Sequence, residues 1–175
     1  KKLLKDKFKL HQSISITTRP PRRGERNGAD YFFVSAEEFI RMIDAKELLE
    51  YEENFGFLYG TPKKAVEALL QKGRNVLLSI DVKGAMNVRK SYPQNSVLIF
   101  VMPPSMEELK KRLESREADT AKAILNRLKV AKQEVASKDK YDYTVVNDRL
   151  DAAYKKLKEI IILEGEKDAA GTRNR

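Results

Sequence analysis

Three arginines and a tyrosine near the start of the chain could bind a phosphate group. Arg19, Arg22 and Arg23 fall within five positions around a Pro-Pro pair. In a polyproline segment, which has three residues per turn, the side chains of Arg19 and Arg22 would project from the same side. Two planar guanidinium groups on a stiff backbone suit a dianionic phosphate, and the following strand brings the Tyr31 hydroxyl beside them. A basic loop without a ligand is the alternative.

A second group of polar side chains could recognise a purine base. Glu50 lies in the strand-like segment LLEYEE, and Tyr59 and Thr61 follow soon after it. Guanine carries N–H donors that a carboxylate can accept and a carbonyl oxygen to which a hydroxyl can donate. Glu50, Thr61 and Ser15 could supply both kinds of group, while Tyr59 would join the arginines at the phosphate. Glu50 could equally belong to a solvated strand edge.

Three polar residues follow apolar runs that are typical of buried strands. Asp81 follows NVLLSI, and Asn147 and Asp148 follow YTVV. Nearly continuous apolar runs indicate strands covered on both faces, and functional groups in open parallel sheets lie at the carboxyl ends of such strands. Asp81 could instead be only the N-cap of the next helix.

Three further arginines, Arg112, Arg116 and Arg127, lie in a charged helical pair that the sequence predicts at 107–116 and 120–135. A mobile lid could carry these arginines onto a phosphoryl group during its transfer. The alternative is that they lie on solvated helix faces.

The first part of the chain predicts a small antiparallel module. A capping box of Ser35 and Glu38 begins a helix, and Thr61 with Pro62 is expected to supply the N-cap and first residue of another helix, which Gly73 ends. Strands are expected at 13–18, 31–34, 48–53 and 57–59, and helices at 36–45 and 63–72.

Strands and helices alternate from residue 75 onward, which indicates a parallel α/β sheet. Strands are expected at 75–81, 97–102 and 141–147, and helices at 83–90, 107–116, 120–135 and 150–166. Ser105 and Glu108 form a second capping box. We expect residues 1–10 to end a basic helix that runs into the first strand, and residues 168–175 to form a frayed tail.

Composition narrows the functional classes. The 175 residues suit one domain, and 35 Lys+Arg against 26 Asp+Glu give a net charge of +9, which favours an anionic partner. The absence of cysteine excludes a thiolate zinc site, and the single histidine, His11, argues against a histidine-built metal site. Since no apolar run reaches transmembrane length and no signal peptide is recognisable, we expect a cytoplasmic protein.

Together these motifs resemble the guanylate kinase family of P-loop nucleoside monophosphate kinases. The resemblance implies an α/β fold with a parallel-sheet P-loop kinase core, a small antiparallel GMP-binding module and a helical lid. The blocks that carry it, in the family's order, are SISITTRPPRRGE, GADYFFVS, LLEYEENFGFLYGTP, NVLLSIDVKGA, VLIFVMPPSMEELKKRL and YDYTVVND. The implied boundaries are 1–13, 62–108 and 138–167 for the core, 14–61 for the module, 109–137 for the lid and 168–175 for the tail.

The resemblance also implies an activity: phosphoryl transfer from ATP to GMP with Mg²⁺, giving ADP and GDP. It implies that GMP contacts Ser15, Arg19, Arg22, Tyr31, Glu50, Tyr59, Thr61 and Asp81. Arg19, Arg116 and Arg127 would be catalytic, and Arg116 and Asn147 would contact ATP. We expect no protein-built metal site, no nucleic-acid or membrane partner, and a monomer or homodimer.

The sequence departs from the family pattern in one functional motif. The Walker A loop GxxxxGKS/T is absent from the 175 residues. Because its amides and lysine cradle the ATP phosphates, we expect this chain by itself not to bind ATP or to transfer a phosphoryl group. Smaller departures are Ser79, Lys83, Glu117, Ala118 and Arg149.

Two other functions fit part of the pattern. The first is a guanylate-kinase-like interaction domain that binds phosphopeptides with the same arginines and has no kinase activity. The retained Glu50, Thr61 and Asp81 argue against it, because a peptide binder does not need groups that read a base. The second is a basic RNA-binding protein, which only the net charge favours.

Overall fold

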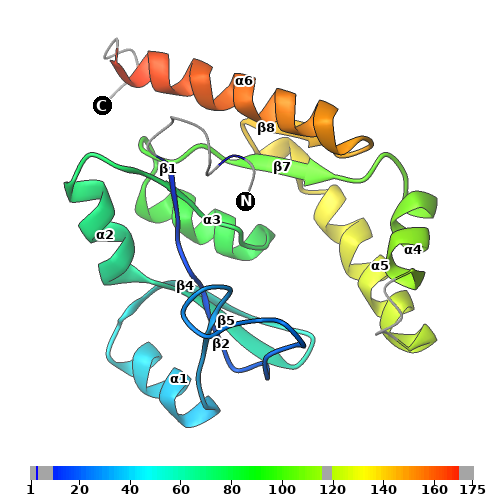
Figure 1. Cartoon of the computed structure of the whole chain (residues 1–175), viewed down its shortest axis with the longest axis horizontal. Coiled ribbons are helices and arrows are strands. Elements are labelled where there is room, and N and C mark those ends of the chain that lie inside the picture. Colours follow the sequence, from blue (N-terminus) through cyan, green and yellow to red (C-terminus); the bar gives the residue numbers. More distant parts are fainter. Residues whose placement is uncertain (1–2, 4–9, 116–119, 170–175) are drawn as a thin grey trace. The chain divides into compact units, whose positions relative to one another are not determined.

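A computed structural model of the chain describes residues 3, 10–115 and 120–169, and the structural statements below concern these residues. The chain divides between Pro93 and Gln94 into two compact units, each with its own strands and helices. The predicted α/β fold class is confirmed (Figure 1).

The first unit contains a parallel strand pair. β1 (Leu10–Gln12) pairs in parallel with β6 (Asn75–Leu77). β6 is shorter than the strand expected at 75–81, and β1 was not predicted, because the first strand was expected to begin only at Ser13. The pairing ends at Gln12 and Leu77, and one more hydrogen bond follows, from the amide of Ser13 to the carbonyl oxygen of Leu77. Each strand extends only as far as its partner pairs with it.

A four-stranded sheet forms the rest of the strand structure in this unit. Its order is β3-β2-β5-β4, and β2 pairs in parallel with β3, so the sheet is mixed rather than wholly antiparallel as expected. The long loop between these two strands turns the chain so that both run in the same direction. The strands are β2 (Ile16–Thr17), β3 (Phe32–Phe33), β4 (Leu48–Asn54) and β5 (Phe57–Pro62).

The β4–β5 hairpin carries a bulge. Leu48 pairs with Pro62 and Glu50 pairs with Thr61, so that Leu49 is an extra residue on β4. From Glu50 to Asn54 the pairing is regular. Successive side chains of a strand alternate between its faces, so Glu50, Glu52 and Asn54 share one face.

Three helices complete the described part of the first unit: α1 (Ala36–Asp44), α2 (Lys63–Gln71) and α3 (Val82–Ser91). Ser35 caps α1, as predicted, and the fully buried Phe39 anchors that helix. The prediction that Thr61 caps α2 is wrong. Pro62 occupies the N-cap position, because Thr61 belongs to β5 and its hydroxyl donates to Glu50.

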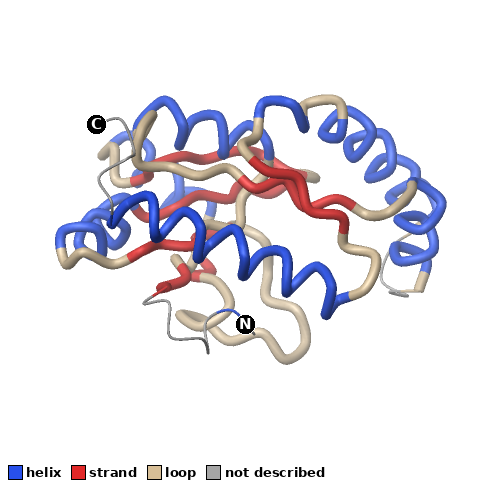
Figure 2. The backbone as a smooth tube through the Cα atoms, turned by 90° about the horizontal axis from the view of Figure 1, so that it is seen from above, coloured by secondary structure: helices blue, strands red, loops and turns tan. Residues whose placement is uncertain are grey.

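The second unit contains β7 (Ile99–Met102), paired in parallel with β8 (Tyr143–Val146). Its helices are α4 (Met106–Glu114), α5 (Ala121–Val135), a short 3₁₀ helix (Lys138–Lys140) and α6 (Leu150–Ala169). The long α6, which crosses the front of Figure 2, packs on β8 and buries Val145, Ala153 and Ile160 in one cluster.

Two further expectations concern the ends of the chain, which the structure describes only in part. The helix α6 reaches Ala169, so the first residues of the expected tail are helical, and 170–175 lie outside the described part. The predicted helix at 1–10 falls mostly outside it as well. None of the described helices is long and apolar enough to cross a membrane.

Candidate functional site

A buried carboxylate and a buried hydroxyl face each other on β4 and β5. Glu50 pairs directly with Thr61 across the antiparallel ladder. Thr61 is fully buried, Glu50 is 7% exposed, and the Thr61 hydroxyl donates to Oε1 of Glu50. The alternative that Glu50 lies on a solvated strand edge is therefore wrong. A buried carboxylate with a hydroxyl partner is a costly arrangement for a fold and favours a ligand-binding role.

The pKa of Glu50 is raised above its ordinary value. Burial contributes most, and the negative charges of Asp81 and Glu52 add to it, while the hydrogen bond from Thr61 acts in the opposite direction. No cation of the described residues is among the causes of this shift. Ligand N–H groups that donate to it would supply the missing stabilisation.

Asp81 lies beside this pair at the start of α3. It is the N-cap of the helix, and its Oδ1 accepts a hydrogen bond of 2.8 Å from the amide of Gly84. The side-chain amide of Asn54, on the same face of β4 as Glu50, donates to Oδ2. The N-cap role proposed as an alternative is real, and it fixes Asp81 where its charge acts on Glu50. Sequence reasoning missed the contact of Asn54 with Asp81.

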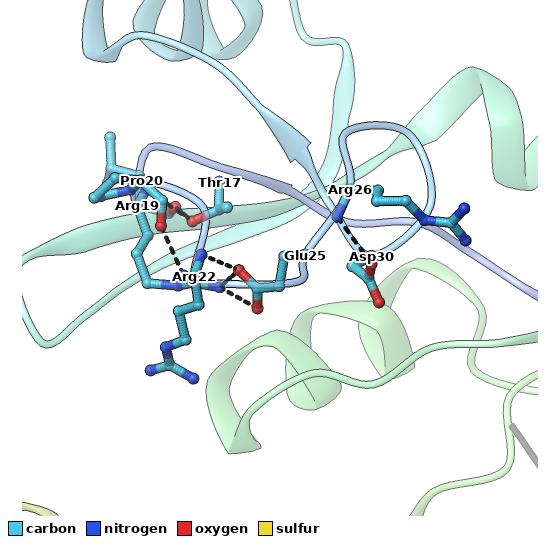
Figure 3. A network of polar contacts seen from close by, with 8 residues as sticks. Thr17, Arg19, Pro20, Arg22, Glu25, Arg26 and Asp30 are labelled. Carbon is cyan, nitrogen blue, oxygen red and sulfur yellow. Dashed lines mark hydrogen bonds and ion pairs between the residues drawn. The ribbon is translucent and has the colours of Figure 1, made fainter. Parts of the chain in front are cut away.

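The loop after β2 holds a second, oppositely charged group (Figure 3). Arg19 is buried, and its Nη2 atom lies 2.9 Å from both carboxylate oxygens of Glu25. Its Nη1 donates to the carbonyl oxygen of Pro20 at 2.7 Å, and its amide donates to the hydroxyl of Thr17 at 3.1 Å. The arginine is therefore fixed at both its backbone and its guanidinium.

Aromatic rings surround the same guanidinium. Its central carbon lies 5.5 Å from the ring centroid of Tyr31 and 5.8 Å from that of Phe33. The ring of Tyr59 packs edge-on against Tyr31, with centroids 6.1 Å apart. The structure thus brings together Arg19, Tyr31 and Tyr59, which the sequence assigned to one phosphate. A cation against aromatic faces keeps its charge while it is shielded from water.

The remaining predicted residues of the first unit lie in the same sheet region. Arg22 is exposed, and its guanidinium points away from Glu25 in Figure 3. Ser15 is half-buried, and its carbonyl oxygen accepts from the amide of Phe32 at 2.9 Å. Lys83, one of the departures from the family pattern, lies 3.5 Å from the carboxylate of Glu52, so it pairs with the face that carries Glu50.

In the second unit, Asn147 directly follows β8, and its amide donates to the carbonyl oxygen of Met102 at 2.7 Å. Arg127 is half-buried on α5. Arg116, Glu117 and Ala118 lie outside the described residues.

Arg112, which the sequence assigned to a lid or to a solvated helix face, is a structural residue of the second unit. Its Nε atom donates to Glu108 at 2.9 Å, and its Nη1 and Nη2 atoms donate to the carbonyl oxygens of Asn147 at 2.8 Å and Asp148 at 3.2 Å. One guanidinium thus ties α4 to the loop after β8. Only the planar fork of an arginine can make all three bonds.

Comparison with known proteins gives consistent results. A family model described as guanylate kinase matches residues 1–164. The guanylate kinase of Bacillus subtilis is 47% identical over 156 residues, which cover 89% of this chain and 76% of that protein. The guanylate kinase of Prochlorococcus marinus is 45% identical over 161 residues, covering 92% and 87%.

The solved structures agree with the sequence comparison. The crystal structure of guanylate kinase from Anaplasma phagocytophilum matches with a TM-score of 0.81 and 38% identity, over 93% of this chain and 78% of that one. The likeness to these enzymes thus extends over about nine tenths of the chain, in sequence and in fold, and the chain belongs to the guanylate kinase family.

Proposed function

We propose that the protein transfers the γ-phosphoryl group of ATP to GMP, giving ADP and GDP, and that the first unit binds GMP. The main support for binding GMP at this unit is that two buried groups of opposite charge lie on different strands of one mixed sheet. The buried carboxylate of Glu50 lies on β4, and the buried guanidinium of Arg19 follows β2. GMP has the matching polarity, because its base carries N–H donors and its phosphate is anionic.

At the base end, Glu50 would accept hydrogen bonds from the N–H groups of guanine, and Asp81 would assist. Thr61 holds the Glu50 carboxylate by donating to it, and Ser15 completes the set of polar groups. Adenine presents a lone pair where guanine presents the N1 hydrogen. A buried carboxylate facing that lone pair would be left unpaired, which is the strongest basis for rejecting a base.

At the phosphate end, Arg19, Arg22, Tyr31 and Tyr59 would bind the phosphate oxygens. Arg19 is already ordered between Glu25 and the aromatic rings. Arg22 is exposed and would turn toward the phosphate when it arrives. Guanidinium and hydroxyl donors together neutralise and orient a dianion.

The chemical step would be an in-line displacement. An oxygen of the GMP phosphate attacks the γ-phosphorus of ATP, and the bond from that phosphorus to the β,γ-bridging oxygen breaks, so that ADP leaves. No covalent enzyme intermediate is needed, because positioning and charge neutralisation supply the catalysis. Arg19, Arg116 and Arg127 would stabilise the charge of the moving group, and Arg116 with Asn147 would contact ATP.

Magnesium fits this scheme as an ion bound to the phosphates of ATP. Among the described residues, no group of three His, Cys, Asp or Glu side chains could hold a metal ion. Mg²⁺ in kinase sites is bound largely by substrate phosphates and water, so it needs no such cage, and it would neutralise the phosphate charge.

We further propose a role in purine nucleotide metabolism in the cytoplasm, as a monomer or homodimer with small-molecule partners.

The alternative of a phosphopeptide-binding domain would use the arginine loop but not Glu50, Thr61 and Asp81. The decisive experiment is titration calorimetry of the 175-residue chain with GMP and, as a control, AMP. We expect binding that is selective for GMP. A folded chain that binds neither nucleotide, or both equally, would overturn the placement of GMP. Turnover is measured separately, on a chain to which the Walker A loop has been added because the 175 residues lack it, as ADP release that depends on both ATP and GMP.

A further inference from the structure

We propose that Glu25 is a positioning residue of the phosphate site, which orders Arg19 and closes the arginine loop before GMP binds. The proposal rests on the function proposed above, in which Arg19 grips the GMP phosphate. Glu25 was not among the residues that the sequence assigned to the site. It lies in the loop between β2 and β3, six residues after Arg19.

Glu25 makes two kinds of contact at once (Figure 3). Both of its carboxylate oxygens lie 2.9 Å from Nη2 of Arg19. Its Oε2 also accepts a hydrogen bond of 2.7 Å from the amide of Arg22, while the amide of Glu25 donates to the carbonyl oxygen of Arg22 at 3.0 Å. The side chain therefore links the guanidinium to the backbone of the turn that carries the second phosphate-binding arginine.

The pair differs from an ordinary surface ion pair. The Arg19 side chain is only 9% exposed and that of Glu25 only 20%. The pKa of the Glu25 carboxyl is lowered, chiefly by the hydrogen bond from the Arg22 backbone and also by Arg19, against the effect of burial. Glu25 thus stays ionised near neutral pH. A shielded pair of this kind restricts the arginine far more than an exposed one does.

The contacts leave Arg19 able to bind a ligand. A guanidinium has five N–H donors, and Glu25, the Pro20 carbonyl and Tyr59 use at most four of them among the described contacts. At least one donor therefore remains for a phosphate. Because the guanidinium is fixed in advance, the phosphate does not have to order it, and less binding free energy is lost.

The proposal makes a prediction that opposes simple electrostatics. Removing a carboxylate beside a phosphate site makes the site more positive, so Coulomb's law alone predicts tighter binding of anions. If Glu25 acts by positioning, its removal should weaken binding of the phosphate instead. The sign of the change therefore separates the two effects.

The test compares Glu25→Ala and Glu25→Gln with the wild type in calorimetric titrations of GMP, guanosine and inorganic phosphate. We expect Glu25→Ala to weaken GMP and phosphate binding about tenfold, the loss for one charge-assisted hydrogen bond, and to leave guanosine binding unchanged. The affinity of Glu25→Gln for GMP and phosphate should lie between those of the wild type and Glu25→Ala, because one amide oxygen can still accept from both Arg19 and Arg22. Glu67→Ala, which removes a glutamate of α2 whose side chain is 40% exposed, is the matched control and should leave the binding of all three ligands unchanged.

Tighter or unchanged GMP binding by Glu25→Ala would overturn the proposal. An equal loss for guanosine and GMP would also overturn it, since that pattern indicates general disorder of the site. Should circular dichroism show that Glu25→Ala is unfolded, the Gln variant decides by the same criterion. Failure of the proposed function looks different, because the wild type itself would then show no preference for GMP over AMP.

Discussion

The carboxylate of Glu50 lies directly against the backbone of Gly84. A Cβ atom added to Gly84 would stand 2.5 Å from Oε2 of Glu50 and 3.3 Å from Oδ1 of Asp81. The first distance is far shorter than any ordinary contact between carbon and oxygen. A residue without a side chain at this point in the first turn of α3 lets the helix and the two carboxylates approach one another.

Gly84→Ala should therefore displace the Glu50 carboxylate and reduce the preference for GMP over AMP about tenfold or more. Binding of inorganic phosphate should be unaffected, because the arginine loop is not touched. Gly165→Ala is the control, since a Cβ at that helical position meets no atom within 4 Å. It should stabilise the protein by about 0.5–1 kcal/mol and leave the preference intact. Equal selectivity in both variants would contradict the prediction.

Glu50→Ala should remove the recognition of guanine but keep that of phosphate. We expect the preference for GMP over AMP to fall by about 1–3 kcal/mol, the usual cost of losing hydrogen bonds to a buried charged group. Glu53→Ala is a control on the same strand, because Glu53 is exposed. Calorimetry with both nucleotides measures the difference. If Glu50→Ala binds GMP and AMP as the wild type does, Glu50 does not read the base.

Because the pKa of Glu50 is raised, the difference in free energy of unfolding between Glu50→Gln and the wild type should depend on pH. The folded protein binds this proton more tightly than the unfolded chain, whose value is about 4.5. Stability therefore falls as pH rises from that value through the raised folded pKa, and the full penalty applies above it. Glu50→Gln removes the penalty. Urea unfolding should show a gain for Glu50→Gln over wild type that is larger at pH 7 than at pH 4.5, and a gain independent of pH would refute this explanation.

Arg112→Lys should destabilise the second unit by about 1–3 kcal/mol, because a lysine cannot bond Glu108 and two carbonyl oxygens at the same time. Amide hydrogen exchange should rise at Asn147, whose amide closes the end of the β7–β8 ladder. Arg149→Lys, at an exposed arginine nearby, is the matched control. Similar unfolding curves for the two variants would show that the three bonds contribute little.

Local signals in the sequence predicted local structure well. Ser35 and Ser105 cap their helices as expected, with each hydroxyl accepting from an amide three residues later. The grouping of Arg19, Tyr31 and Tyr59 was also predicted, because the turn and the strand that follows the arginines return the chain beside them. The prediction for Thr61 was wrong for a physical reason. Its hydroxyl could accept a hydrogen bond from a helix amide or donate one to a carboxylate. The pairing of β5 with β4 places it beside Glu50, so it donates to the carboxylate.

The unpredicted contacts depend on the path of the chain in space. Glu25 reaches Arg19 because the loop closes on itself, and Asn54 reaches Asp81 because β4 passes the start of α3. Neither residue has a spacing that marks it in the sequence. The small size of Gly84 likewise matters only because a carboxylate from a distant strand lies against it.

The bulge at Leu49 determines where this part of the chain can change in length. Deleting Leu49 would leave Glu50 opposite Thr61, because the regular pairing begins at Glu50. Deleting one residue between Glu50 and Asn54 would turn Asn54 to the opposite face and break its bond to Asp81. We therefore expect insertions and deletions in related enzymes to accumulate on the α1 side of Glu50, while the interval from Glu50 to Asn54 keeps a constant length.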